Sequence, residues 1–263
     1  MYNFDYVKAS SVADAVSTLA DEDAQAVSGG QTLIPTLKQR LGMPSKLVDL
    51  TGIAEMSGIA VTADAVDLGG AARHVEVEHS SDVRNAFPTL AALAGGIGDP
   101  QVRNRGTVGG SVANNDPSAC YPSACLGTGA TIRTSNGDIA ADDFFVGMFD
   151  TALGEGQIVT SVSFPIPMRA NYQKFVQPAS RFALVGVFVA QYASGVRVAV
   201  TGASEGGVFR WADAEAALSA DFSPDAIAGL SVSADGMIGD IHGSPEYRAH
   251  LVGVMTKRAV AAA

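Results

Sequence analysis

The segment from Gly95 to Pro122, GGIGDPQVRNRGTVGGSVANNDPSACYP, constrains the fold of this chain more than any other. Seven residues between Gly95 and Gly110 are glycine or proline. Such a density of residues that interrupt regular backbone structure predicts a long loop rather than a helix or a strand. Glycine lacks a β-carbon, so the backbone N–H groups of this loop can come within hydrogen-bonding distance of an anion, most often a phosphate.

A second, shorter glycine segment, Ser28-Gly29-Gly30-Gln31-Thr32, lies upstream. The apolar run Ala24–Val27 predicts a strand before it, and Lys46–Leu50 predicts another strand after the next helix. We expect Thr32 to cap that helix. Its apolar side is expected to contain Leu33, Ile34, Leu37 and Leu41. This βαβ-like order places the glycine turn at a helix N-terminus, where the helix dipole favours anions. Two such loops predict a ligand with two phosphates.

Composition excludes several classes of function. The chain has 263 residues, enough for a sizeable core and for two domains, and a net charge of −10. Nucleic acid is therefore an unexpected partner, because phosphate binding needs a basic patch. The apolar runs are too short or too interrupted to span a bilayer, and the first residues do not resemble a signal peptide, so we expect a cytoplasmic protein without membrane insertion.

Cysteine and histidine are too few for most metal chemistry. Only Cys120 and Cys125 are present, whereas an iron–sulfur cluster needs four thiolates. We interpret them as buried thiols rather than a redox pair. The four histidines lack metal-ligand spacing, so no metal site is expected.

Local signals predict the remaining elements of the first part of the chain. Ser10 and Ser11 are expected to cap a helix, and Ile59–Ala72 to form strands. Ser80–Ala94 predicts two short helices separated by Pro88. Asp116 is expected to cap a helix with Pro117 in its first turn. Asn136-Gly137 predicts a tight hairpin, and Ile158–Phe164 predicts a strand.

The sequence changes character after Pro167. We place a domain boundary between Pro167 and Ala170, which gives domains of residues 1–168 and 169–263. The first has two subdomains, about 1–55 and 56–168. In the second, Phe182–Tyr192 and Val196–Thr201 predict a hairpin. Ala212–Leu218 and Glu246–Val260 predict helices.

Known nucleotide motifs distinguish the possible ligands. Neither the P-loop pattern nor G-x-G-x-x-G after a first strand is present, which disfavours a nucleoside triphosphate or a Rossmann site. The long segment also gathers hydroxyl, amide and backbone donors at Thr107, Gly109, Gly110, Ser111 and Asn114.

The segment IGDPQVRNRGTVGGSVANNDPSACYP closely resembles the FAD-binding subunit of the molybdenum hydroxylases, the aerobic carbon monoxide dehydrogenase and xanthine dehydrogenase type. SGGQTLIPTLKQRL is similar to that family's first flavin loop, and the terminal GSPEYRAHLVGVMTKRA also fits. The resemblance covers essentially the whole chain. It implies an α+β fold, with a two-subdomain FAD-binding fold of the vanillyl-alcohol-oxidase (PCMH) type and a small α+β C-terminal domain.

The resemblance also implies the cofactor contacts. Ser28–Leu33 and Thr107–Ser111 would enclose the pyrophosphate and ribityl chain, Ile97, Gly98 and Asp99 would lie beside the isoalloxazine ring, and Tyr172 or Lys174 would line its edge. The implied cofactor-binding residues are Ala26, Val27, Ser28, Gly29, Gly30, Gln31, Thr32, Leu33, Ile97, Gly98, Thr107, Val108, Gly109, Gly110, Ser111, Asn114, Asp116, Cys120, Val159 and Lys174. We assign no catalytic side chain.

Some positions leave alternatives open. Cys120 occupies a position where the family often has an acidic residue that contacts adenosine, so either Asp116 substitutes or adenosine is held less tightly. Asp116 could equally be a helix cap. Arg103 and Arg105 could offset pyrophosphate charge or form ion pairs. Neither loop contains histidine, so we expect noncovalent FAD.

The resemblance implies a medium subunit in a dimer of heterotrimers. A small subunit with [2Fe-2S] clusters and a large molybdopterin subunit would be its partners, and electrons would pass through FAD to an external acceptor. A free-standing FAD oxidoreductase and a flavin-free scaffold or assembly protein are the alternatives. The acceptor and the substrate of the molybdenum subunit are not legible in this sequence.

Overall fold

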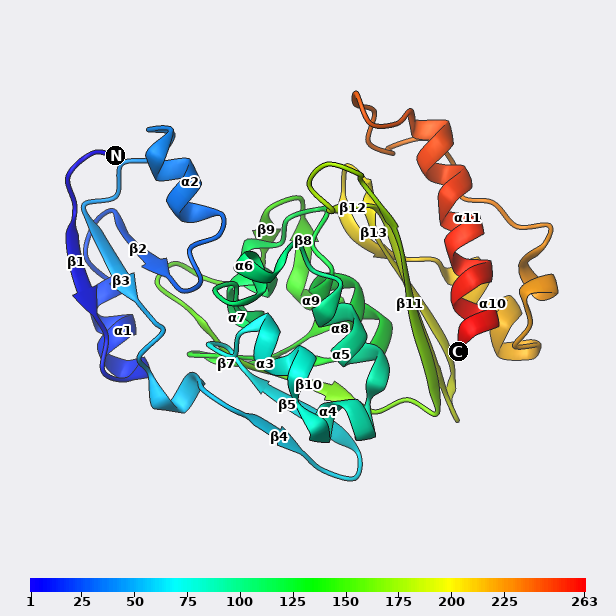
Figure 1. Ribbon diagram of the computed structural model, residues 1–263, viewed down its shortest axis with the longest axis horizontal. Coiled ribbons are helices and arrows are strands. Elements are labelled where there is room, and N and C mark those ends of the chain that lie inside the picture. The colour runs from blue at the N-terminus through cyan, green and yellow to red at the C-terminus, as the bar shows by residue number, and fades with distance from the viewer.

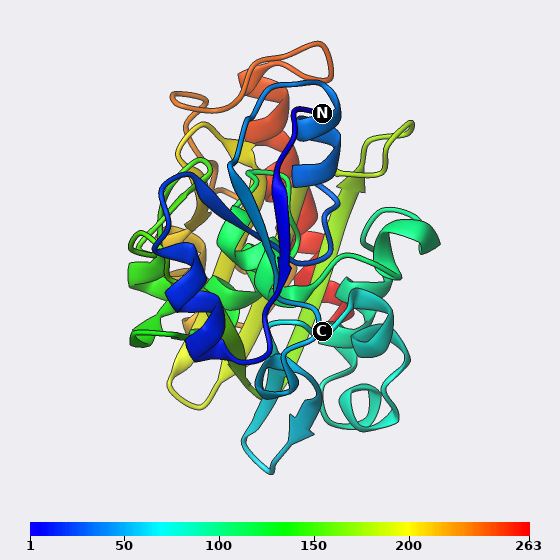
Figure 2. The same cartoon turned by 90° about the vertical axis from the view of Figure 1, so that its left-hand side faces the viewer.

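A computed structural model describes residues 1–263. Its N-terminal part is a small parallel sheet with two helices (Figures 1 and 2). The elements are β1 (Asp5–Lys8), α1 (Val12–Leu19), β2 (Ala24–Val27), α2 (Leu33–Lys38) and β3 (Lys46–Asp49), followed by the 3-10 turn η1 (Ala54–Met56). The strand order is β1-β3-β2, and both pairs are parallel. The predicted βαβ unit is therefore confirmed.

The middle of the chain surrounds a five-stranded antiparallel sheet of order β4-β5-β10-β6-β7. Its strands are β4 (Ile59–Val61), β5 (Ala65–Gly69), β6 (Thr131–Thr134), β7 (Gly137–Ala140) and β10 (Val159–Pro165). Between β5 and β6 come α3 (His74–His79), α4 (Ser81–Ala86), α5 (Pro88–Gly95), α6 (Pro100–Arg103), α7 (Val108–Asn114) and α8 (Tyr121–Thr128). The short helix α9 (Ala141–Phe144) leads into a two-stranded hairpin, β8 (Phe145–Gly147) and β9 (Asp150–Thr151).

The C-terminal part is a four-stranded antiparallel sheet of order β11-β12-β13-β14. It contains β11 (Arg169–Val176), β12 (Ala183–Tyr192), β13 (Gly195–Ser204), β14 (Gly207–Arg210), α10 (Ala212–Ala220), the 3-10 turn η2 (Pro224–Ile227) and α11 (Pro245–Ala262). Helices α10 and α11 cover one face, and α8 packs on the other face (Figure 1). No helix is both long enough and apolar enough to cross a bilayer.

Strand β12 joins the two large cores of the molecule. Phe188 and Ala190 point into the core around α8 and β10, whereas Val187 and Val189 point into the core beneath α11. Successive side chains of a strand face opposite sides of the sheet, so a strand buried on both faces is apolar throughout. This explains the continuous apolar run in β12, and it fixes the C-terminal sheet against the middle of the chain.

Most of the expected elements are confirmed. Ser11 caps α1 by accepting a hydrogen bond from the N–H of Asp14. The helix pair at Pro88, the Asn136-Gly137 hairpin, the hairpin of β12 and β13, and the helices α10 and α11 all occur where expected. The sequence patterns do not predict the helices α3, α6 and α9 or the strands β1, β8, β9, β11 and β14.

Three local expectations are wrong. The Thr32 side chain makes no capping hydrogen bond, and Leu41 lies beyond the end of α2 and is exposed. Asp116 does not cap a helix, because its carboxylate accepts the N–H of Ser118 at 2.8 Å in a turn, and α8 starts only at Tyr121.

The reason for the last error is a tertiary contact. The Thr201 hydroxyl donates to the carbonyls of Pro117 and Ala119 at 2.9 and 2.8 Å, and the N–H of Gly202 also donates to Pro117. The segment after α7 is therefore held on β13 instead of starting a helix.

Candidate functional site

The turn between β2 and α2 presents unused backbone donors. The N–H groups from Gly29 to Leu33 donate to no acceptor within the chain. Gly30 adopts a φ of +69°, a left-handed conformation that favours glycine. The segment lies at the N-terminus of α2, where unpaired N–H groups and the helix dipole both attract negative charge. This arrangement suits an anion.

The structure brings the two predicted glycine segments together. The hydroxyls of Ser28 and Thr107 are hydrogen-bonded at 2.9 Å. A β-carbon on Gly29 would lie 2.3 Å from the carbonyl oxygen of Arg105 and 2.6 Å from the α-carbon of Gly106. Only glycine allows this approach, because real β-carbons do not come within 3.0 Å of other heavy atoms. Gly29 therefore lets one segment pack directly on the other.

The second segment is partly helical, which corrects the expectation of a continuous loop. Its residues Val108–Asn114 form α7, and Thr107 caps this helix by accepting the N–H of Gly110 at 3.2 Å. Both glycine segments thus precede a helix. The Ser111 hydroxyl and the Asn114 side chain form no hydrogen bond within the chain, and Gly110 is exposed.

Two of the backbone donors expected here are already used. The N–H groups of Val108 and Gly109 donate to the carbonyls of Ala72 and Gly70, both at 2.9 Å. A β-carbon on Gly109 would lie 2.8 Å from the Gly70 oxygen. Gly109 is therefore required by packing against the end of β5, and the expectation that its N–H faces a ligand is wrong.

The loop before α6 holds the residues expected beside a flavin ring. Gly98 has a φ of +48°, and Ile97 is half-buried. Arg103 donates to the Ile97 carbonyl at 3.2 Å and forms an ion pair with Glu78 at 2.7 Å. From the opposite side, the Lys174 amine donates at 2.7 Å to the carbonyl that precedes Ile97. The structure therefore brings Lys174 to this loop, and Arg103 acts as an ion-pair partner.

Other expected contacts lie in the protein interior. Val159 and Cys120 are 3% and 4% exposed and belong to the core, and Tyr172 packs on the same core with its hydroxyl buried. Ala26 and Val27 end β2, and Val27 packs against Leu37 and Leu47. These positions support the two segments from behind.

His74 is a buried support that the sequence analysis does not single out. A β-carbon on Gly106 would lie 2.7 Å from His74 Nε2, so the imidazole packs directly beneath the contact that Gly29 makes. Burial, reinforced by the Arg103 guanidinium, lowers the pKa of His74 to about 4. The ring is therefore neutral at pH 7 and lies 5.4 Å from the ring of Tyr121, centroid to centroid.

Arg105 differs from Arg103 in that its charge is unpaired. It is exposed and has no ion-pair partner. It lies near Tyr6: the Asp49 carboxylate, which accepts the Tyr6 hydroxyl, raises the pKa of Tyr6, and the Arg105 charge opposes that shift. The Arg105 guanidinium is thus available beside the junction of the two segments.

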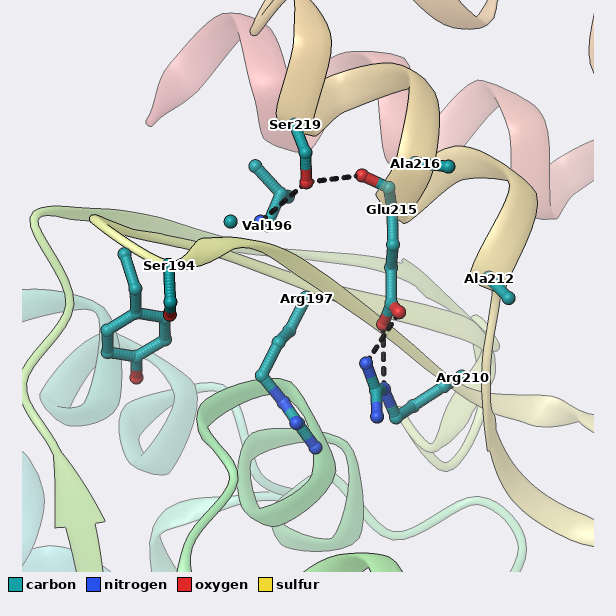
Figure 3. A pocket seen from close by; sticks show the side chains of 10 residues that line it. Ser194, Val196, Arg197, Arg210, Ala212, Glu215, Ala216 and Ser219 are labelled. Carbon is teal, nitrogen blue, oxygen red and sulfur yellow. Dashed lines mark hydrogen bonds and ion pairs between the residues drawn. The ribbon is translucent and has the colours of Figure 1, made fainter.

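A separate cavity of about 400 Å³ lies between β13 and α10 (Figure 3). Its charges are internally matched: Arg210 donates to both carboxylate oxygens of Glu215 at 2.8 and 2.6 Å, and Arg197 pairs with Asp142 at 2.6 Å. The Ser219 hydroxyl bridges the Val196 N–H and the Glu215 carbonyl. These contacts explain the cavity as part of the packing of the C-terminal sheet.

The comparisons with known proteins identify the family. A family model described as the FAD binding domain in molybdopterin dehydrogenase matches residues 2–167. This chain belongs to that family. It is an FAD-binding medium subunit of the molybdenum hydroxylase class and a component of an oxidoreductase, as the sequence resemblance predicts.

Relatives of the flavin subunit match over nearly their whole length. The chain is 35% identical to the nicotine 6-hydroxylase medium subunit of Paenarthrobacter nicotinovorans, over 97% of this chain and 95% of that protein. It is 30% identical to the carbon monoxide dehydrogenase medium chain of Hydrogenophaga pseudoflava, over 99% and 96%.

Solved structures agree on the fold of the flavin subunit. Carbon monoxide dehydrogenase from Hydrogenophaga pseudoflava matches with a TM-score of 0.88 and 31% identity, over 100% of this chain and 97% of that chain. Quinoline 2-oxidoreductase from Pseudomonas putida 86 matches with a TM-score of 0.89 and 28% identity, over the same shares. The predicted α+β FAD-binding fold is confirmed.

The residues present fit FAD. The unused N–H groups at the start of α2 and the free charge of Arg105 suit the pyrophosphate, and the hydroxyls of Ser28 and Thr107 lie where the two segments meet. A diphosphate is held well by backbone donors at a helix N-terminus.

Replacing Gly29 by alanine is expected to weaken FAD binding at least about tenfold, or 1.4 kcal/mol. The added methyl group would collide with the backbone at Arg105 and push the two segments apart. The dissociation constant can be measured by titrating FAD into the apoprotein and following flavin fluorescence. Gly229→Ala is the matched control, because a β-carbon there meets nothing within 4 Å. Equal affinity in the two variants would contradict the packing role of Gly29.

Acidification is expected to destabilise the site through His74. Its pKa is about 4 in the folded state and about 6.5 when exposed, so the unfolded chain binds the proton first. The resulting stability is complete above pH 6.5 and is lost as the pH falls toward 4. From pH 7 to 5 the free energy of unfolding should drop by about 2 kcal/mol from this group.

Urea unfolding of the wild type and of His74→Gln at both pH values tests this contribution. The variant should be less stable at pH 7 but should show a smaller drop. His250→Gln, at an exposed position, should behave as the wild type. An unchanged pH dependence in His74→Gln would refute the assignment.

Proposed function

We propose that this chain is the medium subunit of a cytoplasmic heterotrimer, doubled in the assembled enzyme. A small subunit with [2Fe-2S] clusters and a large molybdopterin subunit would be its partners. Electrons would enter from the cluster subunit and leave to an external acceptor. The family membership supports this role, and the relatives are named as medium chains or medium subunits.

The proposed domain boundaries follow the division of the chain into sheets. Residues 1–168 would bind FAD, with subdomains of about 1–55 and 56–168, and residues 169–263 would form the C-terminal domain. The change from the five-stranded sheet, which ends at Pro165, to the four-stranded sheet, which starts at Arg169, supports this boundary. In this arrangement the two segments that contact each other at Gly29 come from different subdomains.

The proposal rests on the unused N–H groups from Gly29 to Leu33. They lie where Gly29 packs against the second glycine segment. These groups would bind the pyrophosphate, and the hydroxyls of Ser28 and Thr107 would orient it. Ile97, Gly98 and Lys174 would lie along the ring. FAD supplies the electron-transfer chemistry, and the protein binds and positions it. The geometry assigns no side chain a proton-transfer role.

Arg105 is proposed to offset the pyrophosphate charge, since Arg103 is committed to Glu78. Arg105→Ala should weaken FAD binding about fivefold at low salt, and the difference should shrink at high salt because the contact is electrostatic. Titrations of FAD at two ionic strengths measure this effect. The control is Arg258→Ala, an exposed arginine without hydrogen-bond partners on α11. A loss that is independent of salt would argue against a charge contact.

Isolation of the native complex tests the proposed function. We expect this chain to co-purify with two other subunits, with molybdenum, iron and FAD all present. Removing FAD should abolish electron delivery to the acceptor while the clusters are still reduced by substrate. Recovery of the chain alone, with flavin that its own substrate reduces, would instead indicate a free-standing oxidoreductase. Recovery without flavin-binding ability would indicate a scaffold.

A further inference from the structure

The β8–β9 hairpin ends in three exposed apolar side chains. Val146, Met148 and Phe149 are 59%, 38% and 56% exposed, and we call them the apolar tip. They fall within four consecutive residues around Gly147. Single exposed apolar residues are ordinary, but a cluster of them marks an interaction site. The FAD contacts described above do not include the tip.

The tip is held in a conformation that costs energy. Phe149 has a φ of +56°, which is a left-handed conformation. In turns this conformation is normally adopted by glycine or asparagine. A bulky residue in this conformation is strained and persists only when its surroundings impose it. A phenylalanine that is both strained and half exposed contributes little to the stability of the fold. This favours a role for Phe149 in contact with another protein.

Asn115 imposes this conformation. Its side-chain amide donates to the carbonyls of Gly147 and Asp150 at 2.7 and 2.9 Å, and its own carbonyl accepts the Phe149 N–H at 3.1 Å. Asn115 is 1% exposed and is itself left-handed, with a φ of +41°. A buried amide therefore fixes both sides of the turn.

The base of the hairpin is anchored as well. Phe144 is completely buried, and its ring packs edge-on against Phe145 at 5.1 Å. On the other side, the start of β14 comes so close that a β-carbon on Gly207 would lie 3.3 Å from the Gly147 oxygen. The apolar tip is thus a rigid projection, which lowers the entropy cost of binding a partner.

Unpaired carboxylates flank the tip. Asp143 precedes the hairpin, Asp150 lies within it, and Glu205 lies on the turn just before β14; all three are exposed and none forms an ion pair. An apolar projection with an acidic rim matches a partner that has an apolar socket with lysine or arginine around it. The net charge of −10 adds long-range attraction to such a partner.

We propose that the apolar tip is the docking site for the iron–sulfur subunit. This inference rests on the proposed function. The choice of partner follows from position: Asn115 ends α7, and Thr107, at the other end of this seven-residue helix, forms part of the FAD site. Seven residues of helix span about 10 Å. A subunit seated on the tip is therefore held about one helix length from Thr107 and the proposed FAD site, and Asn115 is the residue that positions the tip.

The test is Phe149→Asn in the native complex. Asparagine accepts the left-handed conformation, so the thermal stability of this chain should stay equal or rise, while the apolar contact is lost. We expect at least tenfold weaker retention of the iron–sulfur subunit on dilution, with normal FAD content. Ile241→Ser, which removes an apolar side chain that is 96% exposed elsewhere, should leave retention unchanged.

A second variant tests the acidic rim without touching the strained turn. The double change Asp143→Lys and Glu205→Lys should slow association with the iron–sulfur subunit, most strongly at low salt. Retention equal to that of the wild type in both variants would overturn the proposal. Release of the molybdenum subunit alone, or loss of FAD with the complex intact, would also overturn it. If the proposed function itself is wrong, the wild-type chain will already purify without partner subunits. That result differs from a loss of partners in the variants alone.

Discussion

The close packing of Gly29 on the backbone of Arg105 and Gly106 is the contact on which the site depends. It joins the parallel N-terminal sheet to the middle of the chain at the point where both present a helix N-terminus. The hydrogen bond between Ser28 and Thr107 fixes the same junction. The proposed FAD site uses residues from both segments, so it depends on this contact. The neutral ring of His74 supports it from within.

The two glycine segments look alike in sequence but serve different purposes. At the first, the N–H groups remain free, so glycine allows both a left-handed turn and a ligand to approach. At the second, Gly109 allows the backbone to reach Gly70, and its N–H is consumed there. The cost of a buried, unpaired N–H explains this difference: the Gly109 N–H lies next to a carbonyl and is paired with it, whereas the N–H groups of the first segment have no acceptor within the chain.

Local patterns predict most of the longer strands, most of the longer helices and the two glycine segments, because those depend on nearby residues. What failed depended on distant ones. Asp116 and Pro117 carry a proper helix-start signal, yet Thr201 captures the segment. The sequence gives no reason to treat Arg103 and Arg105 differently. They differ in the fold because Glu78 forms an ion pair with Arg103 only. No sequence pattern indicates that His74 supports the site. Its ring packs against Gly106, which is thirty-two residues away in the chain and leaves room for the ring because it has no side chain.

The two ends of α7 contact the first glycine segment and the exposed hairpin. Thr107 caps its start with a side chain that also contacts Ser28, and Asn115 ends it with a side chain that shapes the hairpin. Each residue lies at one end of the helix and also contacts another segment: Thr107 bonds Ser28, and Asn115 makes three hydrogen bonds to the hairpin. Since α7 is only about two turns of helix, the hairpin and the junction of the two glycine segments are joined without an intervening hinge. Asn115 ends the helix in a left-handed conformation, and its hydrogen bonds to Gly147, Asp150 and Phe149 hold the strained turn in place.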